Sequence, residues 1–151
     1  MDASNAVHQD CKGQTGGLMT IGKGDIYSTS VKQKINTKSS TEIEIVAVDD
    51  VMPQIMWTKY FLEAQGYTNN DIILHQDNMS AMLLEANGSM SSTKRTKHIN
   101  VRYYFIKDRI DSKYLKLRWC STDMMLADFF TKPLLGPKFW EFRKLIMNSN
   151  Y

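Results

Sequence analysis

The sequence contains only two cysteines, Cys11 and Cys120, in 151 residues. They lie far apart and form neither a CxxC pair nor the spacing of a zinc site, which argues against a disulfide-stapled secreted scaffold and fits a reducing compartment. No apolar run approaches the ~20 residues that a membrane-spanning helix needs, and the N-terminal residues do not resemble a signal peptide. We therefore expect an intracellular protein that is neither secreted nor bound in a membrane.

The sequence also lacks a phosphate-binding loop and a strong excess of charge. The glycine run at residues 13–17 is not followed by the Gly-Lys-Ser/Thr ending of such a loop, so we interpret it as a bend before a strand. The net charge is only +3, but basic residues gather in two groups. Local groups of this kind favour a polyanionic partner more than bulk charge does. They are Lys32, Lys34 and Lys38 in one group, and Lys94, Arg95, Lys97 and Arg102 in the other.

The hydrophobic content of 42% is enough for one domain with a real core, and we expect residues 1–151 to form it. Alternation and turn residues predict an antiparallel hairpin at residues 18–21 and 26–31, and further strands at 72–76 and 114–120. Helical periodicity predicts a long helix to about residue 64, with a kink or a break at Pro53. Further helices are predicted after residue 80, at 99–110, at 124–132 and after Pro137. This order predicts an α/β layered domain with a mixed sheet.

Asp77 directly follows the apolar strand predicted at residues 72–76 and precedes a helix start, which Asn78 or Ser80 can cap. Chemistry in α/β sheets lies just beyond the carboxyl ends of the strands, although Asp before a helix is more often only a turn and capping residue. Glu42 in the first turn of a helix and Asp128 after the last strand are comparable acids, and such carboxylates suit Mg²⁺. We interpret Glu44 and its neighbours Asp49 and Asp50 as solvated. Three tryptophans are assigned to the core: Trp57, Trp119 and Trp140.

Four motifs carry a resemblance to a known family. They are Ser-Ser-Thr-Glu-Ile-Glu at residues 39–44, Gln-Asp-Asn at 76–78, Arg-Thr-Lys-His-Ile at 95–99 and Leu-Ala-Asp-Phe-Phe-Thr-Lys-Pro at 126–133. In this order they resemble the ribonuclease H domain at the end of copia-type retrotransposon polyproteins, over nearly the whole chain. The resemblance implies a ribonuclease H-like three-layer fold, in which a mixed central sheet of an antiparallel hairpin plus parallel strands is flanked by helices. Most of the first strand would be absent, because the chain begins one residue before Asp2.

The resemblance implies that Asp2, Glu42, Asp77 and Asp128 are the catalytic acids and the ligands of two Mg²⁺ ions, with Mn²⁺ as an alternative. Nothing in the local pattern would have selected Asp2. Two such ions would support hydrolysis of the RNA strand of an RNA/DNA hybrid. Asp2 and Asp77 would bridge the ions, with Glu42 and Asp128 each completing one side. Cellular ribonucleases H carry a histidine in the loop before the last acid, whereas residues 120–125 hold none.

Further residues would contact the hybrid through phosphates and 2′-hydroxyls. They are Gln14, Ser39, Ser40, Asn78, Lys94, Arg95, Lys97, His98 and Arg102. His98 could instead cap the next helix. The other implied partner is the reverse transcriptase domain of the same polyprotein, and we expect the isolated chain to be a monomer. The implied location is the cytoplasm, with the nucleus or a virus-like particle as alternatives.

Two other functions are compatible with the sequence. A degenerate ribonuclease H-like remnant could bind nucleic acid or pack against a reverse transcriptase without cutting. The presence of all four acids favours the enzyme, since a binding module does not require them. An integrase-like nuclease on the same kind of fold is disfavoured, because the residue spacing around residues 126–128 resembles that of ribonucleases H.

Overall fold

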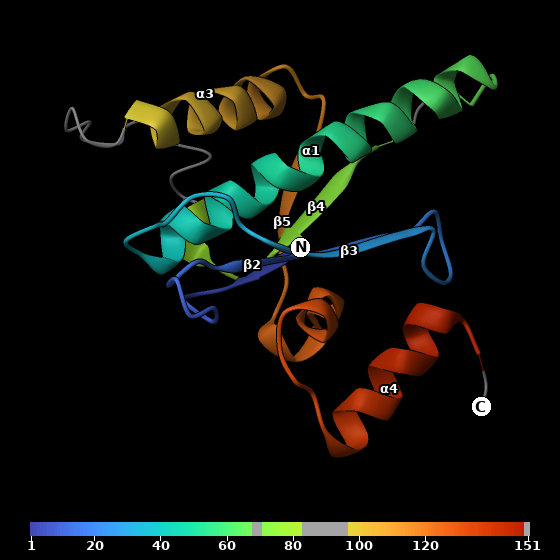
Figure 1. The fold of residues 1–151 in the computed structure, drawn as a ribbon. Helices are drawn as coiled ribbons and strands as arrows, with labels where there is room; N and C mark the ends of the chain where they lie inside the picture. Colours follow the sequence, from blue (N-terminus) through green and yellow to red (C-terminus); the bar gives the residue numbers. More distant parts are fainter. Residues whose placement is uncertain (68–70, 83–96, 150–151) are drawn as a thin grey trace.

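The computed structural model describes residues 1–67, 71–82 and 97–149 (Figure 1). The strands are β1 (Asp2–Ser4), β2 (Gln14–Met19), β3 (Tyr27–Lys32), β4 (Ile73–Gln76) and β5 (Lys116–Trp119). The helices are α1 (Ser40–Ala64), α3 (Lys97–Asp111) and α4 (Gly136–Met147), and residues 79–82 are also helical. Two short 3-10 helices, η2 (Thr122–Met124) and η3 (Leu126–Phe130), stand where an α-helix over residues 124–132 was expected. The result is an α/β fold with antiparallel and parallel strand pairs.

The predicted hairpin is present as β2 and β3, which pair antiparallel from Gln14↔Lys32 to Met19↔Tyr27. β1 pairs antiparallel with the other edge of β2, with Asp2 opposite Gly16. The hairpin strand therefore starts at Gln14, several residues before the apolar run that identified it. Gly16 and Gly17 lie within this strand and pair with β3, so the interpretation of residues 13–17 as a bend before the strand is wrong. Glycine is needed there because other elements pack directly against both positions.

The strands form two sheets where one mixed sheet was expected. β1, β2 and β3 form an antiparallel sheet, and β4 and β5 form a separate parallel pair. β1 has only three residues. The residue before it, Met1, contacts β4 through its amino group, which donates to the His75 carbonyl at 3.1 Å, and through its sulfur, which accepts from the Gln76 side chain at 3.6 Å. These contacts do not make a ladder. β4 alternates between exposed and buried residues, with Ile73 37% exposed, so it is not covered on both faces as its apolar run suggested.

Helix α1 begins at the N-cap Ser39, whose side chain accepts a hydrogen bond from the Glu42 backbone. It runs without a break through Pro53 to Ala64, so a break at Pro53 is excluded and a kink there stays a prediction. The first half of α1 is buried almost all round rather than along one stripe. This is because α1 contacts β1 and β2 on one side and α3 on another, where Tyr103 and Ile106 of α3 complete the core.

Two adjacent glycines of β2 show how the layers are arranged. A Cβ on Gly17 would meet the side chain of Val51 in α1, whereas a Cβ on Gly16 would meet Thr131 and the carbonyl of Ala127. Successive strand residues point to opposite faces, so α1 covers one face of the antiparallel sheet and η3 covers the other. α1 and α3 lie together above the strands, and α4 lies below them beside η3 (Figure 1).

The three tryptophans assigned to the core are all exposed. Trp57 is 59% exposed on α1, Trp119 is 53% exposed on β5, and Trp140 is 57% exposed on α4. The core is built instead from aliphatic residues and Tyr103. Among the described residues, no helix is both long enough and apolar enough to cross a bilayer.

Candidate metal centre

Three carboxylates from three separate elements meet at one end of the strands. Asp2 of β1, Glu44 of α1 and Asp77 after β4 each offer an oxygen, and these oxygens all lie within 4.8 Å of one another. Asp2 is 2% exposed and Glu44 is 5% exposed. Within the described ranges, no lysine or arginine forms an ion pair with Glu44 or Asp77. Buried like charges repel, so this arrangement suits a cation that lies between the three groups.

Asp2 reaches the centre because β1 pairs with β2 and places it opposite Gly16. The Thr131 hydroxyl donates a short hydrogen bond to Asp2 Oδ2. Burial raises the pKa of the Asp2 carboxyl, although the bond from Thr131 and the charge of Lys132 act to lower it. Asp2 is thus held in place by a residue 129 positions away in the sequence.

Glu44 is a buried member of the cluster, and the interpretation of it as a solvated helix acid is wrong. It lies in the part of α1 where Ile43, Ile45 and Val46 are buried as well. Burial, followed by the charge of Asp2, raises the pKa of Glu44 to about 8. The Gln76 side chain donates to Glu44 Oε2 at 3.3 Å. The sequence signal that could have revealed Glu44 is an acid inside an otherwise apolar helical run.

Glu42 has a different position, and the structure does not place it with the other acids. Its Oε2 accepts a hydrogen bond from the backbone N–H of Lys38 at 2.7 Å, while its own backbone N–H donates to Ser39 Oγ at 3.2 Å. The spacing is that of a capping box, in which Ser or Thr is followed three residues later by Glu or Gln. The bonds are a variant of it, because the Glu42 carboxylate accepts the N–H of Lys38, one residue before the N-cap Ser39, instead of that of Ser39 itself. Glu42 therefore serves the start of α1.

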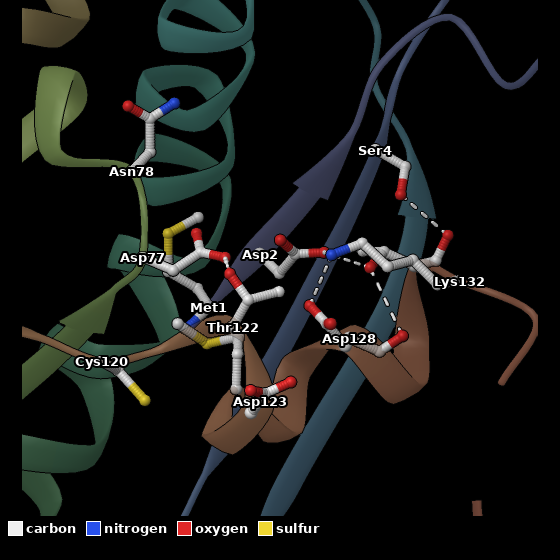
Figure 2. Close-up of polar contacts among 12 residues, drawn as sticks. Met1, Asp2, Ser4, Asp77, Asn78, Cys120, Thr122, Asp123, Asp128 and Lys132 are labelled. Carbon is white, nitrogen blue, oxygen red and sulfur yellow. Dashed lines mark hydrogen bonds and ion pairs between the residues drawn. The ribbon is translucent and has the colours of Figure 1, made fainter. Parts of the chain in front are cut away.

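Asp77 is fixed from both sides. Its backbone N–H donates to Gln76 Oε1 at 3.0 Å. Its Oδ2 accepts from the Thr122 hydroxyl at 3.0 Å (Figure 2). Gln76 is fully buried. Its side-chain amide connects the turn after β4 to Glu44 on α1, because its oxygen accepts from Asp77 and its nitrogen donates to Glu44. Sequence reasoning missed Gln76. Asn78 Oδ1 accepts from the Ala81 backbone N–H at 3.0 Å, which confirms the expected capping of the following helix.

Asp128 lies on η3 beside the cluster and is 1% exposed. Its Oδ1 pairs with Lys132 Nζ at 2.7 Å, and the same ammonium lies 3.6 Å from Asp2 Oδ2 (Figure 2). Burial acts to lower the pKa of Lys132, but the hydrogen bond to Asp128 and the nearby carboxylates raise it overall. The structure therefore brings Asp2, Asp77 and Asp128 to one region, with Lys132 among them.

The residues present fit a hard divalent cation. Asp2, Glu44 and Asp77 supply only oxygen donors, which Mg²⁺ and Mn²⁺ prefer. Gln76 and Thr122 hydrogen-bond to two of these ligands and fix their orientation, as residues behind metal ligands generally do.

The residues expected to contact nucleic acid have varied surroundings. Gln14 bonds to His8 and Ser30, and Ser39 and Ser40 lie at the start of α1. Arg102 pairs with Asp49 of α1, so this charge joins two helices. Asp49 is therefore ion-paired rather than simply solvated. Asp50 is exposed, but its Oδ2 accepts a hydrogen bond from the Thr15 hydroxyl at 3.0 Å. Lys94 and Arg95 lie outside the described residues, as do the side chains of Lys97 and His98.

Comparison with known proteins found no matching family model and no matching solved structure. Among curated proteins, the chain is 35% identical over 140 residues to the retrovirus-related Pol polyprotein from transposon TNT 1-94 of Nicotiana tabacum. It is 33% identical over 132 and 147 residues to those from transposons RE2 and RE1 of Arabidopsis thaliana. These matches cover 87–96% of the chain but only 9–10% of each relative, so the chain spans about a tenth of their length. With this similarity over nearly its whole length, the chain belongs to the Pol polyproteins of copia-type retrotransposons.

Proposed function

We propose that this chain is a single ribonuclease H-like domain that hydrolyses the RNA strand of RNA/DNA hybrids with two divalent metal ions. The observation that carries the proposal is the meeting of Asp2, Glu44 and Asp77 within 4.8 Å, with Asp128 beside them. Membership of the Pol polyprotein family supports it, because reverse transcription produces RNA/DNA hybrids. The proposed partners are such a hybrid and the reverse transcriptase domain of the same polyprotein.

In this proposal Glu44, and not Glu42, is the acid that α1 contributes. Asp2 is central, because it lies near Glu44 and Asp77 on one side and is linked through Lys132 to Asp128 on the other. Bound Mg²⁺ or Mn²⁺ would supply the Lewis acidity that activates water and stabilises the leaving oxygen. The protein's own residues bind and orient: Gln76 holds Glu44, Thr122 holds Asp77 and Thr131 holds Asp2.

The decisive experiment compares cleavage of a labelled RNA/DNA hybrid with that of duplex DNA and duplex RNA, with and without Mg²⁺. Asp77→Asn keeps the shape of the side chain but loses the charge that binds metal, so we expect the folded variant to lose metal-dependent cleavage. Asp123→Asn is the matched control, because the Asp123 side chain is 98% exposed and lies outside the cluster. Undiminished cleavage by the Asp77 variant would refute the assignment.

The alternative is a remnant that binds hybrids without cutting them. The exposed Trp57, Trp119 and Trp140 give it a specific basis, since exposed rings can stack on bases. Wild-type protein that binds the hybrid but leaves it intact at saturating Mg²⁺ would favour this alternative. Cleavage confined to the hybrid would favour the enzyme.

A further inference from the structure

The ammonium group of Lys132 lies between two buried carboxylates of the candidate site. Its Nζ is 2.7 Å from Asp128 Oδ1 and 3.6 Å from Asp2 Oδ2. The side chains of Asp2 and Asp128 are 3% and 2% exposed, whereas that of Lys132 is 37% exposed. Figure 2 shows the lysine side chain extending across the space between the two acids. A cation thus already occupies one half of the carboxylate cluster.

The backbone around Lys132 is firmly attached to the sheet. The N–H groups of Thr131 and Lys132 both donate to the Asp128 carbonyl, at 3.2 and 2.9 Å. The Ser4 hydroxyl of β1 donates to the Thr131 carbonyl at 2.9 Å. The base of the lysine side chain is therefore fixed, while its four side-chain torsions can turn the partly exposed ammonium toward solvent.

The four acids consequently form two groups that share Asp2. The negative charge of the Asp2–Asp128 group is partly neutralised by a lysine, whereas in the described part of the chain that of Glu44 and Asp77, in the Asp2–Glu44–Asp77 group, is not. Asp2, Glu44 and Asp77 approach one another with no ion pair to Glu44 or Asp77 among the described residues. Asp128, by contrast, has the Lys132 ammonium as its close partner. Two buried carboxylates that share a cation become strongly unfavourable when the cation is removed without replacement. A divalent ion between Asp2 and Asp128 would thus have to replace this ammonium.

We propose that Lys132 is a positioning residue that occupies the second cation position of the site, so that the second divalent ion binds only by displacing its ammonium. This inference rests on the proposed function, which requires two ions. Its consequence is unequal binding: the first ion enters the group of Asp2, Glu44 and Asp77 without displacing a lysine ammonium, and the second binds weakly. Lys132 then keeps the Asp2–Asp128 group assembled until the second ion arrives.

The test is a titration of the metal-free protein with Mn²⁺, in which the electron paramagnetic resonance of free Mn²⁺ gives the number of ions bound and their affinities. We expect one tight and one weak site in the wild type. In Lys132→Met the second site should tighten by about tenfold or more, because the competing charge is gone. Lys132→Arg keeps the charge, and its second site should remain weak.

Lys107→Met is the matched control. It removes the same charge from the same kind of i,i+4 ion pair, in which Lys107 Nζ lies 2.8 Å from Asp111 Oδ2 on α3, and neither residue belongs to the carboxylate group of the candidate site. Its titration should follow the wild type. A Lys132→Met curve that coincides with the wild type would overturn the proposal, as would an equal change in Lys107→Met.

A second measurement uses the wild-type protein. Lysines carrying ¹³C-methyl groups from reductive methylation are followed by NMR during a Mg²⁺ titration, with Lys132→Arg used only to assign the signal. The Lys132 signal should stay close to its metal-free position over the first equivalent and move with the second. A Lys132 signal that has moved fully after the first equivalent of Mg²⁺, or that does not move at all, would contradict the proposal. Neither the Mn²⁺ titration nor the NMR titration measures cleavage. A protein that does not cut hybrids would therefore refute the proposed function, while the proposal for Lys132 would still be decided by the two titrations.

Discussion

The buried amide of Gln76 donates to Glu44 Oε2 at 3.3 Å and accepts the backbone N–H groups of Asp77 and Asn78 at 3.0 and 3.2 Å. One side chain therefore sets the distance between an acid on a helix and an acid in a loop. Residues behind metal ligands commonly change metal affinity or activity by about 10–100-fold when replaced. Gln76 has the position of such a residue, although it is not itself one of the clustered acids.

Replacing Gln76 with Leu should weaken Mg²⁺ binding and lower hybrid cleavage by about 10–100-fold. Leucine fills a similar volume but leaves the Asp77 and Asn78 N–H groups without their acceptor. Calorimetric Mg²⁺ titration and initial cleavage rates measure the two effects. Gln54→Leu is the matched control, because Gln54 bonds only weakly to Thr58 on α1, at 3.4 Å. If the Gln76 and Gln54 variants behave alike, Gln76 does not position the acids.

Glu44→Gln should abolish metal-dependent cleavage, whereas Glu42→Gln should leave it near the wild-type rate. Glu44 lies in the carboxylate cluster, while Glu42 completes a capping box in which Gln can replace Glu. The two substitutions remove the same charge two positions apart on one helix, so each controls for the other. Loss of cleavage in the Glu42 variant, with Glu44→Gln still active, would reverse the assignment of the helix acid.

The raised pKa of Glu44 predicts how stability depends on pH. Its pKa is about 8 in the folded protein against an ordinary value of 4.5, so the folded state holds this proton more tightly than the unfolded state does. The resulting stabilisation is full below pH 4.5 and is lost as pH rises through about 8. Urea unfolding of the metal-free protein across this range should show the fall, and Glu44→Gln should remove its part of it. A fall of equal size in both proteins would show that other groups cause it.

The same proton should couple metal binding to pH. Below about pH 8 an ion that binds Glu44 must displace its proton, so Mg²⁺ affinity should increase as pH rises toward that value. Calorimetry in buffers of different ionisation enthalpy measures the protons released. An affinity independent of pH in this range would show that Glu44 is already ionised or does not bind the metal.

Gly16→Ala should destabilise the protein by about 1–3 kcal/mol and reduce cleavage as well. The added methyl would lie 2.5 Å from the Thr131 side chain and 2.9 Å from the Ala127 carbonyl, and a backbone atom cannot turn aside. The segment that carries Asp128 would have to move away from Asp2. Thermal unfolding and cleavage rates check this, with the exposed Ser28→Ala on β3 as a control for substitution in the sheet.

The basic group at Lys94, Arg95 and Lys97 should contact phosphates of the hybrid. Replacing all three with Ala should flatten the dependence of log affinity on log salt by roughly two to three units. Arg102→Ala should behave differently, because that arginine pairs with Asp49 and its loss should lower the melting temperature more than the salt slope. Fluorescence anisotropy with a labelled hybrid gives the slopes. If the salt dependence of the triple variant equals that of the wild type, these three residues are ordinary surface charges that do not contact the hybrid.

The sequence predicted those features that depend on neighbouring residues. The hairpin, the strand before Asp77 and the cap at Asn78 all follow from local alternation and turn chemistry. Asp2 carries no such local signal and came only from the resemblance, whereas Asp128 was a candidate from its place after the last strand. Their proximity depends on β1 pairing with β2, between residues 14 positions apart, and on η3 packing over Gly16, between residues more than a hundred positions apart.

Glu42 and Glu44 illustrate why the sequence pointed to a different helix acid from the one that lies with Asp2 and Asp77. A first-turn acid after Ser39 is conspicuous in the sequence, but the capping box fully accounts for it. Glu44 looked like a surface residue because periodicity indicated a single buried stripe, whereas α1 is buried on several sides. Which side of a helix is covered by a second helix is decided by tertiary packing, and periodicity does not show it.

The pairing of Asp2 with Thr131 also has a consequence in time. A chain emerging from the ribosome presents Asp2 first, then Glu44 and Asp77, and more than fifty residues later the turn that holds Asp2 and carries Lys132. Until that turn is made, Asp2 lacks the Thr131 hydroxyl that holds it, however well the earlier part has folded. The candidate centre therefore cannot form by local folding of any single stretch, and its assembly reports that the whole segment from Asp2 to Lys132 has folded.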